Sequence, residues 1–276
     1  MMRAGLPIVT LHRPAFHQAL ADFHVLCLAN EAALTDEQAA TVRRFVADGG
    51  GLIATFETSL YDDKGNKRSN FALSDLFGAD YAATIPKAKS AVTCTEPHRV
   101  TAGLPAIHHD GAHVIARVTK GRPLAKLADG NAPAIIVNEF GRGRVVFLPG
   151  RLDAMQCEQL DPAFERLIRS AVRWVARDRL PVEIETSAPV AVTLFDQPKR
   201  RILHLVNHNG QTQDPSHQLK PIPNVHLRLQ IPADAHRLHL RTLWHPTDLP
   251  HDINQDLITF TLPSLDDYEI VVADFE

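Results

Sequence analysis

The fold of the first half of the chain is decided by residues 24–55, HVLCLANEAALTDEQAATVRRFVADGGGLIAT. The apolar run that opens this stretch is typical of a fully buried strand in a parallel sheet. Thr35 can accept a hydrogen bond from the amide of Gln38, whose side chain can reach back, so a capped helix begins here. Residues 49–51, three glycines, end the helix, and residues 52–56 predict a second strand. The stretch therefore predicts a right-handed strand–helix–strand crossover.

The same alternation of strand and helix returns before residue 180. Residues 134–139 and 144–149 are strand-like runs joined by a short glycine-containing turn, which predicts a hairpin. Asp161 then begins a helix with Pro162 in its first turn, where the missing amide hydrogen costs little. Apolar residues spaced by three and four continue to Val175 and give this helix one buried face. We therefore expect an open α/β sheet.

The second half of the chain lacks helical patterns. Its strand-like runs are separated by proline, asparagine and aspartate, as in a small antiparallel β-sandwich. These runs are residues 190–195, 201–207, 225–231, 238–244, 257–262 and 269–273. The charge also changes, because residues 181–276 hold 7 Lys/Arg against 13 Asp/Glu. We therefore expect two domains, an α/β domain over residues 1–180 and a β-sandwich over residues 181–276.

Composition excludes several classes of protein. The 276 residues carry a formal net charge of −3, which gives no electrostatic basis for binding nucleic acid or an anionic membrane. No apolar run approaches the roughly 20 residues that cross a bilayer. The three cysteines are odd in number and widely spaced, which argues against a disulfide framework and fits a reducing compartment. We expect a cytoplasmic protein with no nucleic-acid or membrane partner.

The candidate ligand site is the loop that follows the strand 52–56. Open α/β sheets place ligands at the carboxyl ends of their strands, and this loop begins there. Its polar and aromatic residues are Glu57, Thr58, Ser59, Tyr61 and Asp62. The Glu57 carboxylate has the chemistry of an acid, a base or an acceptor for sugar hydroxyls, and the Tyr61 ring offers a platform. The competing and favoured interpretation is that Glu57 and Ser59 satisfy backbone groups of the loop.

Thiol and serine chemistry lack the expected motif. A nucleophile elbow needs a glycine-flanked serine or cysteine at a sharp strand-to-helix turn. Cys27 lies inside a predicted strand, and neither Cys94 nor Cys157 has glycine neighbours. Residues 141–144, GRGR, resemble a phosphate loop, but no helix N-terminus follows to supply amide donors. We predict no catalytic residue and no cofactor in this chain.

A cluster of histidines is the remaining candidate for metal binding. His108, His109, Asp110 and His113 offer imidazole and carboxylate ligands of the kind that suit zinc. Adjacent residues of a strand point to opposite faces, however, so at most part of this set can converge. We interpret the cluster as a surface loop and predict no metal site.

Several motifs resemble those of one known family. Within residues 22–78 these are LTDEQ (34–38), FVADGGGLIAT (45–55), ETSLYD (57–62) and DLFG (75–78). Together they resemble the middle domain of family 42 beta-galactosidases, called the beta-galactosidase trimerisation domain, and GRVVFLPG (143–150) resembles its last strands. In the second half, LHLVNH (203–208) and LPSLDDYE (262–269) are similar to the small β-domain that follows it, so the resemblance covers nearly the whole chain.

The resemblance implies a flavodoxin-like fold of the class I glutamine-amidotransferase type, and a function. In that family, hydrolysis belongs to a preceding TIM barrel that uses two glutamates. A barrel needs roughly 250 residues of its own, so no catalytic pair is carried over to this sequence. The implied function is a non-catalytic, glycoside-hydrolase-associated assembly module with a role at a carbohydrate site. Two alternatives stay open: glycoside hydrolase activity through a separate barrel chain or an upstream part, and, more weakly, an amidotransferase-like hydrolase.

The start of the sequence predicts association with other chains. Residues 6–11, LPIVTL, lie too close to the next strand to be the first strand plus its helix, so we interpret them as the second strand. The first strand and helix are then expected upstream of Met1. A parallel sheet that lacks its central strand exposes amides and carbonyls that seek partners. We therefore expect a homo-oligomer, such as the trimer that the family name implies, or a barrel-bearing partner chain.

Overall fold

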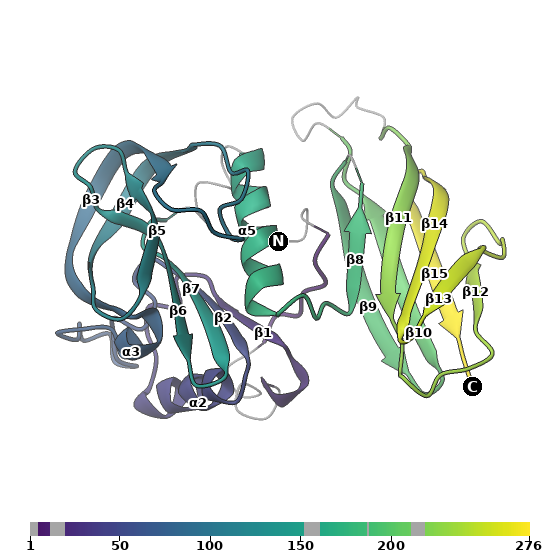
Figure 1. Ribbon diagram of the computed structural model, residues 1–276, viewed down its shortest axis with the longest axis horizontal. Helices are drawn as coiled ribbons and strands as arrows, with labels where there is room; N and C mark the ends of the chain where they lie inside the picture. The colour runs from purple at the N-terminus through teal and green to yellow at the C-terminus, as the bar shows by residue number, and fades with distance from the viewer. Residues whose placement is uncertain (1–4, 12–19, 152–160, 187, 211–218) are drawn as a thin grey trace. The chain divides into compact units, whose positions relative to one another are not determined.

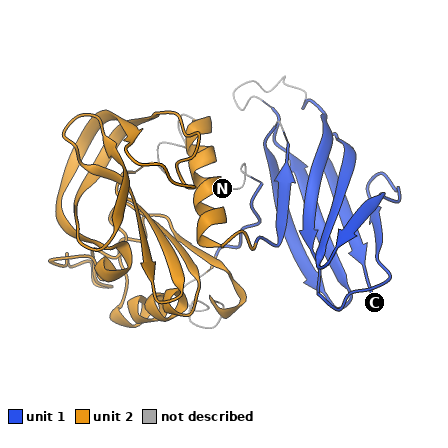
Figure 2. Cartoon of the chain, viewed as in Figure 1, with its two compact units in different colours: residues 1–10, 180–276 blue, residues 11–179 orange. Residues whose placement is uncertain are grey.

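The structure is a computed structural model that describes residues 5–11, 20–151, 161–186, 188–210 and 219–276. It divides into two compact units, which Figure 2 shows in two colours. Unit 2 comprises residues 11–179, and unit 1 comprises residues 180–276 together with residues 1–10. The first ten residues thus group with the β-rich unit, whereas the sequence placed them with the α/β domain.

Unit 2 is built on one mixed seven-stranded sheet with the order β1-β2-β7-β6-β5-β3-β4 (Figure 1). β1, β2 and β7 are mutually parallel, and the remaining neighbours are antiparallel. The strands are β1 (Val25–Leu28), β2 (Gly51–Thr55), β3 (Ala79–Cys94), β4 (Ile107–Val118), β5 (Arg122–Leu127), β6 (Pro133–Phe140) and β7 (Gly143–Leu148). The expected open α/β sheet is present, and its parallel part is confined to three strands.

Helices cover both faces of this sheet. α2 (Asp36–Ala47) and the short α3 (Ser74–Phe77) share one apolar cluster with alternate residues of β2 and β7. α5 (Pro162–Val175) also contacts β2 and β7, although its residues lie outside that cluster. A 3-10 turn, η2, spans Leu20–Asp22. Helices cover β2 on both faces of the sheet, so this strand is buried at every position, as its continuous apolar run predicts.

The local signals in the crossover and the hairpin are confirmed. The Thr35 hydroxyl accepts from the Gln38 amide at 3.0 Å, and the Gln38 side chain accepts from the Thr35 amide at 2.9 Å. Asp161 caps α5 by accepting from Ala163 at 2.8 Å. β6 and β7 pair as far as Phe140 and Gly143, so the GRGR segment begins in a two-residue hairpin turn.

The strand expected at residues 6–11 is wrong. These residues form no strand, Pro7 has no amide hydrogen to donate, and the Val9 side chain is 64% exposed. Within the described residues β1 is accordingly the edge strand, and its side chains alternate between partly and fully buried. The continuous burial expected for residues 24–29 needs cover on both faces of the sheet, and here only Leu26 and Leu28, on one face of β1, belong to the buried apolar cluster.

Unit 1 is a sandwich of two antiparallel four-stranded sheets, with the orders β12-β15-β10-β9 and β13-β14-β11-β8. An apolar cluster drawn from both sheets forms its core. The strands are β8 (Val182–Glu185), β9 (Val190–Gln197), β10 (Arg200–Asn207), β11 (Ile222–Gln230), β12 (His239–Thr242), β13 (His251–Asn254), β14 (Leu257–Leu265) and β15 (Tyr268–Asp274). All six predicted strands are present, and β8 and β13 are the two that the sequence did not predict.

Candidate functional site

The candidate loop lies at the carboxyl ends of the parallel strands β1 and β2. The Thr55 hydroxyl at the end of β2 accepts from the Asn30 amide after β1 at 2.8 Å, which ties the two strand ends together. Phe56 and Ser59 have φ angles of 50° and 65°, a conformation that costs non-glycine residues about 1–3 kcal/mol each. The turn is therefore held by its surroundings rather than by its own preference.

Two of the five candidate residues serve the fold of the loop. Thr58 is fully buried, and its hydroxyl donates to the carbonyl of Thr55 at 2.7 Å and to that of Leu28 at 3.1 Å. Ser59 is also fully buried, and its hydroxyl accepts from the Leu73 amide at 3.2 Å. Both hydroxyls stabilise buried backbone groups. For Ser59 this agrees with the favoured interpretation of the sequence, in which its side chain satisfies a backbone group.

Asp62 and Tyr61 also make local contacts. The Asp62 carboxylate accepts from the amides of Lys64 and Asn66 at 2.9 and 2.8 Å, and from the Asn66 side chain at 2.9 Å. The hydrogen bond from Asn66 is the main reason that the pKa of Asp62 lies below its usual value. Tyr61 is partly buried against the cluster under α2, and its backbone pairs with Ala32 and Leu34.

Glu57 belongs to a different arrangement, a chain of four polar side chains. The Thr84 hydroxyl donates to Glu57 Oε1 at 2.7 Å, and the Tyr81 hydroxyl lies 3.1 Å from Thr84 Oγ1. Lys67 Nζ donates to the Tyr81 hydroxyl at 2.7 Å and lies 4.5 Å from the centre of its ring. We call this Lys67–Tyr81–Thr84–Glu57 series the polar chain.

The polar chain has one consistent direction. An ammonium group can only donate and a carboxylate can only accept, so Tyr81 receives from Lys67 and gives to Thr84, which gives to Glu57. The hydrogen bond to Tyr81 is the main cause that raises the pKa of Lys67 above its usual value. The polar chain thus has the Lys67 ammonium group at one end and connects it by hydrogen bonds to the Glu57 carboxylate at the other.

Sequence reasoning found Glu57 and missed its three partners. Tyr81 and Thr84 lie on β3, a strand that the sequence did not predict, and Lys67 lies in the preceding loop. β3 holds Pro86 and only two buried side chains, and its pairing with β4 is interrupted between Tyr81 and Ala83. The spacing of these three residues in the sequence does not predict that they form a hydrogen-bonded series with Glu57.

The histidine cluster does not form a surface loop, contrary to our interpretation. His109 and His113 lie on β4 and are 0% and 1% exposed, with ring centres 5.2 Å apart. Burial lowers the pKa of His109, and it lowers that of His113 to about 4. His108 points to the other face and is exposed, as alternation requires. The described residues contain no group of three or more possible metal ligands.

The described cysteines have the surroundings of unreactive thiols. Cys27 lies on β1, and Cys94 is exposed at the end of β3, where partial desolvation raises the pKa of its thiol. A raised pKa works against the thiolate that a nucleophile requires. Cys157 lies outside the described residues.

Comparison with known protein families identifies the family to which unit 2 corresponds. A family model described as the beta-galactosidase trimerisation domain matches residues 15–171, which is more than half of the chain. The chain belongs to this family. The matched range holds the trimerisation domain's seven-stranded sheet, its candidate loop and the polar chain.

Solved structures share the fold of the trimerisation-domain protein along nearly its whole length. They include an alpha-L-fucosidase isoenzyme from Paenibacillus thiaminolyticus (17% identity, TM-score 0.75, covering 95% of this chain and 42% of that one). The E323A mutant of the GH42 beta-galactosidase Gan42B from G. stearothermophilus has 15% identity and a TM-score of 0.67, covering 100% and 35%. A beta-galactosidase from Bacillus circulans sp. alkalophilus has 15% identity and a TM-score of 0.65, covering 93% and 34%.

These likenesses concern only part of each neighbour. The chain spans about a third to two fifths of the length of these solved chains. No curated protein matches the sequence. The described residues form one open sheet and two four-stranded sheets, and none of these is an eight-stranded parallel barrel. No helix in the same residues is long and apolar enough to cross a bilayer.

Proposed function

We propose that this chain is a non-catalytic assembly module associated with a glycoside hydrolase. The observation that carries the proposal is the family match over residues 15–171, because that family is named for trimerisation. The state of the candidate loop supports it. The hydroxyls of Thr58 and Ser59 and the Asp62 carboxylate are committed to local hydrogen bonds that shape the loop.

The hydrogen bonding of Glu57 matters because glycoside hydrolysis uses two carboxyl groups. In both stereochemical classes the pair is about 5–10 Å apart, one acting as acid and the other as nucleophile or base. Glu57 instead accepts a hydrogen bond from Thr84 and is the last residue of the polar chain, which begins at the Lys67 ammonium group. We therefore assign Glu57 a positioning role, and we place a sugar contact at this loop on Glu57 and Tyr61.

The first test concerns catalysis by the isolated chain. We expect no turnover of nitrophenyl β-galactoside, because the carboxylates of Glu57 and Asp62 are both engaged in local hydrogen bonds. The control pair is Glu57→Gln and Glu139→Gln, since Glu139 is a glutamate on β6 that forms only a surface ion pair with Arg144 at 3.2 Å. Turnover that is lost in Glu57→Gln and kept in Glu139→Gln would show that the module is an enzyme.

The second test concerns assembly. We expect the 30.5 kDa chain to form a stable homo-oligomer, with a trimer as the form that the family's name suggests. Light scattering coupled to size exclusion gives the mass directly, and dilution shows whether the species is stable. A mass of one chain that persists at tens of micromolar would contradict the assembly function, whatever the outcome of the glycoside assay.

A further inference from the structure

One outer face of the sandwich in unit 1 carries exposed rings. In the sheet β12-β15-β10-β9, alternate side chains such as Val192, Leu203 and Leu205 point into the core. The residues between them point outward, because successive side chains of a strand alternate. Among the apolar residues on or beside this outer face, Phe195 is 50% exposed and Trp244 is 60% exposed. Large exposed apolar groups that gather in one place mark a binding surface.

The rings form one continuous row. Phe195 on β9 meets His204 on β10 with ring centres 5.3 Å apart, and His204 meets Tyr268 on β15 at 5.9 Å. Trp244, in the segment after β12, lies 6.0 Å from Tyr268. We call Phe195, His204, Tyr268 and Trp244 the aromatic row. It crosses three strands of the sheet, so a ligand that lies along it would contact several rings at once.

Buried polar contacts hold the row in place. The Glu269 side chain is 3% exposed, and its carboxylate accepts from the amide of Trp244 at 2.8 Å and from that of His245 at 3.2 Å. The turn that presents Trp244 is therefore fixed by hydrogen bonds to a buried side chain. His204 Nδ1 and the Tyr268 hydroxyl are hydrogen-bonded to each other, which fixes the middle of the row. A surface fixed before binding loses less conformational entropy when a ligand arrives.

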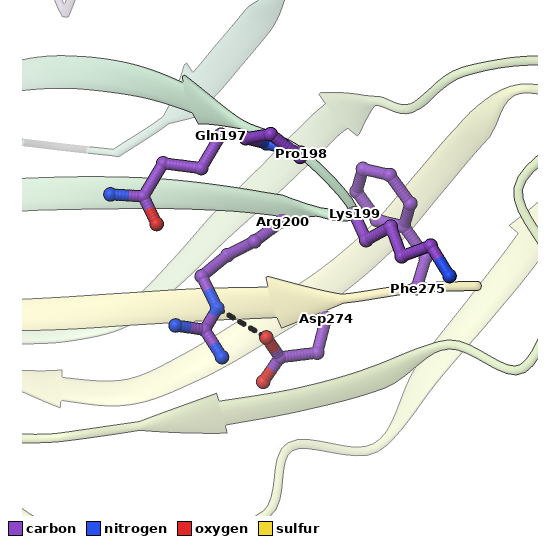
Figure 3. A pocket seen from close by; sticks show the side chains of 6 residues that line it. All are labelled: Gln197, Pro198, Lys199, Arg200, Asp274 and Phe275. Carbon is purple, nitrogen blue, oxygen red and sulfur yellow. Dashed lines mark hydrogen bonds and ion pairs between the residues drawn. The ribbon is translucent and has the colours of Figure 1, made fainter.

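The same face carries planar polar groups at its other end. Arg200 on β10 lies opposite Gln197 on β9 and Asp274 on β15, so the three share the outward side of the sheet. They line a hollow together with Pro198, Lys199 and Phe275, and Figure 3 shows the Arg200 guanidinium beside the Asp274 carboxylate. Arg241 on β12 also contacts Asp274, at 3.2 Å.

The carboxylate in this hollow, that of Asp274, stays ionised near neutral pH. Burial acts to raise the pKa of Asp274, but the hydrogen bonds and charges of Arg200 and Arg241 outweigh it and hold the pKa below its usual value. The hollow thus offers a fixed guanidinium and carboxylate, with the Gln197 amide on the neighbouring strand. Such groups donate and accept in defined directions.

We propose that this outer face of the β12-β15-β10-β9 sheet binds a neutral oligosaccharide. The faces of aromatic rings carry partial negative charge and attract the C–H groups of a sugar ring, and the side chains of Phe195 and Trp244 are both at least half exposed. Sugar hydroxyls both donate and accept, which suits the amide, guanidinium and carboxylate of the hollow. The inference goes beyond the assembly function, because it concerns a unit that lies outside the family match.

Two other occupants fit the face less well. Residues 181–276 hold 7 Lys/Arg against 13 Asp/Glu, so a phosphate-rich ligand would be repelled. A stable protein partner buries about 800 Å² on each side. At 50% and 60% exposure, Phe195 and Trp244 supply only about 75–150 Å² each, from side chains of about 150–250 Å². That area matches a short glycan better than a second protein.

Tryptophan fluorescence provides a direct test. The chain has two tryptophans, and Trp174 is 7% exposed in unit 2 whereas Trp244 is 60% exposed. The probes are the tetrasaccharides of β-1,4-linked galactose, glucose, xylose and mannose, titrated into the full chain. We expect at least one of them to change the emission of Trp244 saturably. No saturable change with any of the four, confirmed by calorimetry, would overturn the proposal.

Variants assign the binding to this face. We expect Trp244→Ala to weaken binding by about tenfold or more and Phe195→Ala by several-fold, as for anchor residues at the centre of an interface. Calorimetry measures the affinity, since Trp244→Ala removes the fluorescent reporter. The matched control is Ile253→Ala, because Ile253 is 53% exposed on β13 of the other sheet and should leave the affinity unchanged.

The remaining outcomes separate this proposal from the assembly function. Affinity that survives both Trp244→Ala and Phe195→Ala, or that is lost only in Glu57→Gln, would place the sugar elsewhere and overturn the proposal. A reduced oligomer mass in Trp244→Ala without sugar binding by the parent would assign the face to a second copy of the chain. Sugar binding by a chain that is monomeric would support this proposal and contradict the assembly function alone.

Discussion

Phe147→Ala should destabilise unit 2 by about 3–5 kcal/mol, the usual cost of removing a buried phenylalanine. Phe147 is fully buried on β7, between β2 and β6 in the sheet. Its ring stacks on Phe77 with centres 4.3 Å apart and planes 5° apart, and Phe71 meets it edge-on at 5.4 Å. Removing the ring takes the shared contact from both neighbours and leaves a cavity in the middle of the sheet.

Urea unfolding followed by circular dichroism measures this effect. The matched control is Phe195→Ala, because Phe195 is 50% exposed and its removal opens no cavity. We expect that control to change the unfolding free energy by less than about 1 kcal/mol. The two units can unfold separately, so each transition is fitted by itself. A loss of under about 1 kcal/mol in Phe147→Ala would mean that the aromatic cluster is not the centre of the core.

The second large effect is a loss of stability in acid. Burial lowers the pKa of His113 to about 4, and a histidine in the unfolded chain titrates near 6.5. Between these two values the unfolded state binds more protons than the folded state, so the unfolding free energy falls as the pH falls. The full contribution of His113 to the unfolding free energy is present above pH 6.5. The difference amounts to about 3 kcal/mol for His113 by the time the pH reaches its folded pKa.

A variant pair isolates this histidine. His113 Nε2 lies 3.0 Å from the Pro133 carbonyl, and a carbonyl only accepts, so Nε2 carries the hydrogen. His113→Gln keeps a donor but cannot titrate, so its unfolding free energy should depend less steeply on pH in this range. His108→Gln is the control, since His108 is exposed on the opposite face of β4. Equal pH dependence in both variants and the parent would contradict the buried, neutral state of His113.

What the sequence could predict follows from local chemistry. The capping box at Thr35, the Asp161 cap and the tight β6–β7 turn each depend on a few neighbouring residues, and all three are confirmed. The β-sandwich strands alternate apolar and polar residues, because one face packs in the core and the other meets solvent. Patterns of this kind are set within a few residues of chain, so they can be read before the fold is known.

The rest depended on contacts between distant residues. β3 pairs with β4 through two register shifts, and only two of its sixteen side chains are buried, so it lacks the alternation that marks a strand. Without β3, nothing placed Tyr81 and Thr84 beside Glu57. The burial of His109 and His113 was missed for a related reason. Histidine has no strong preference for inside or outside, and its position on β4 decides which it becomes.

The grouping of the first residues with the last hundred has a consequence for how the chain is made. Gly5 lies beside β8, where a Cβ placed on it would be in ordinary van der Waals contact with the Ile184 Cβ at 3.5 Å, and Leu6 is buried. A ribosome completes residues 11–179 before it begins the sandwich, and domains generally fold as units during synthesis. Residues 5–10 are therefore separated from the sandwich in the sequence by the whole of unit 2. A sandwich expressed from residue 180 onward would lack this segment and the cover that it gives to Ile184.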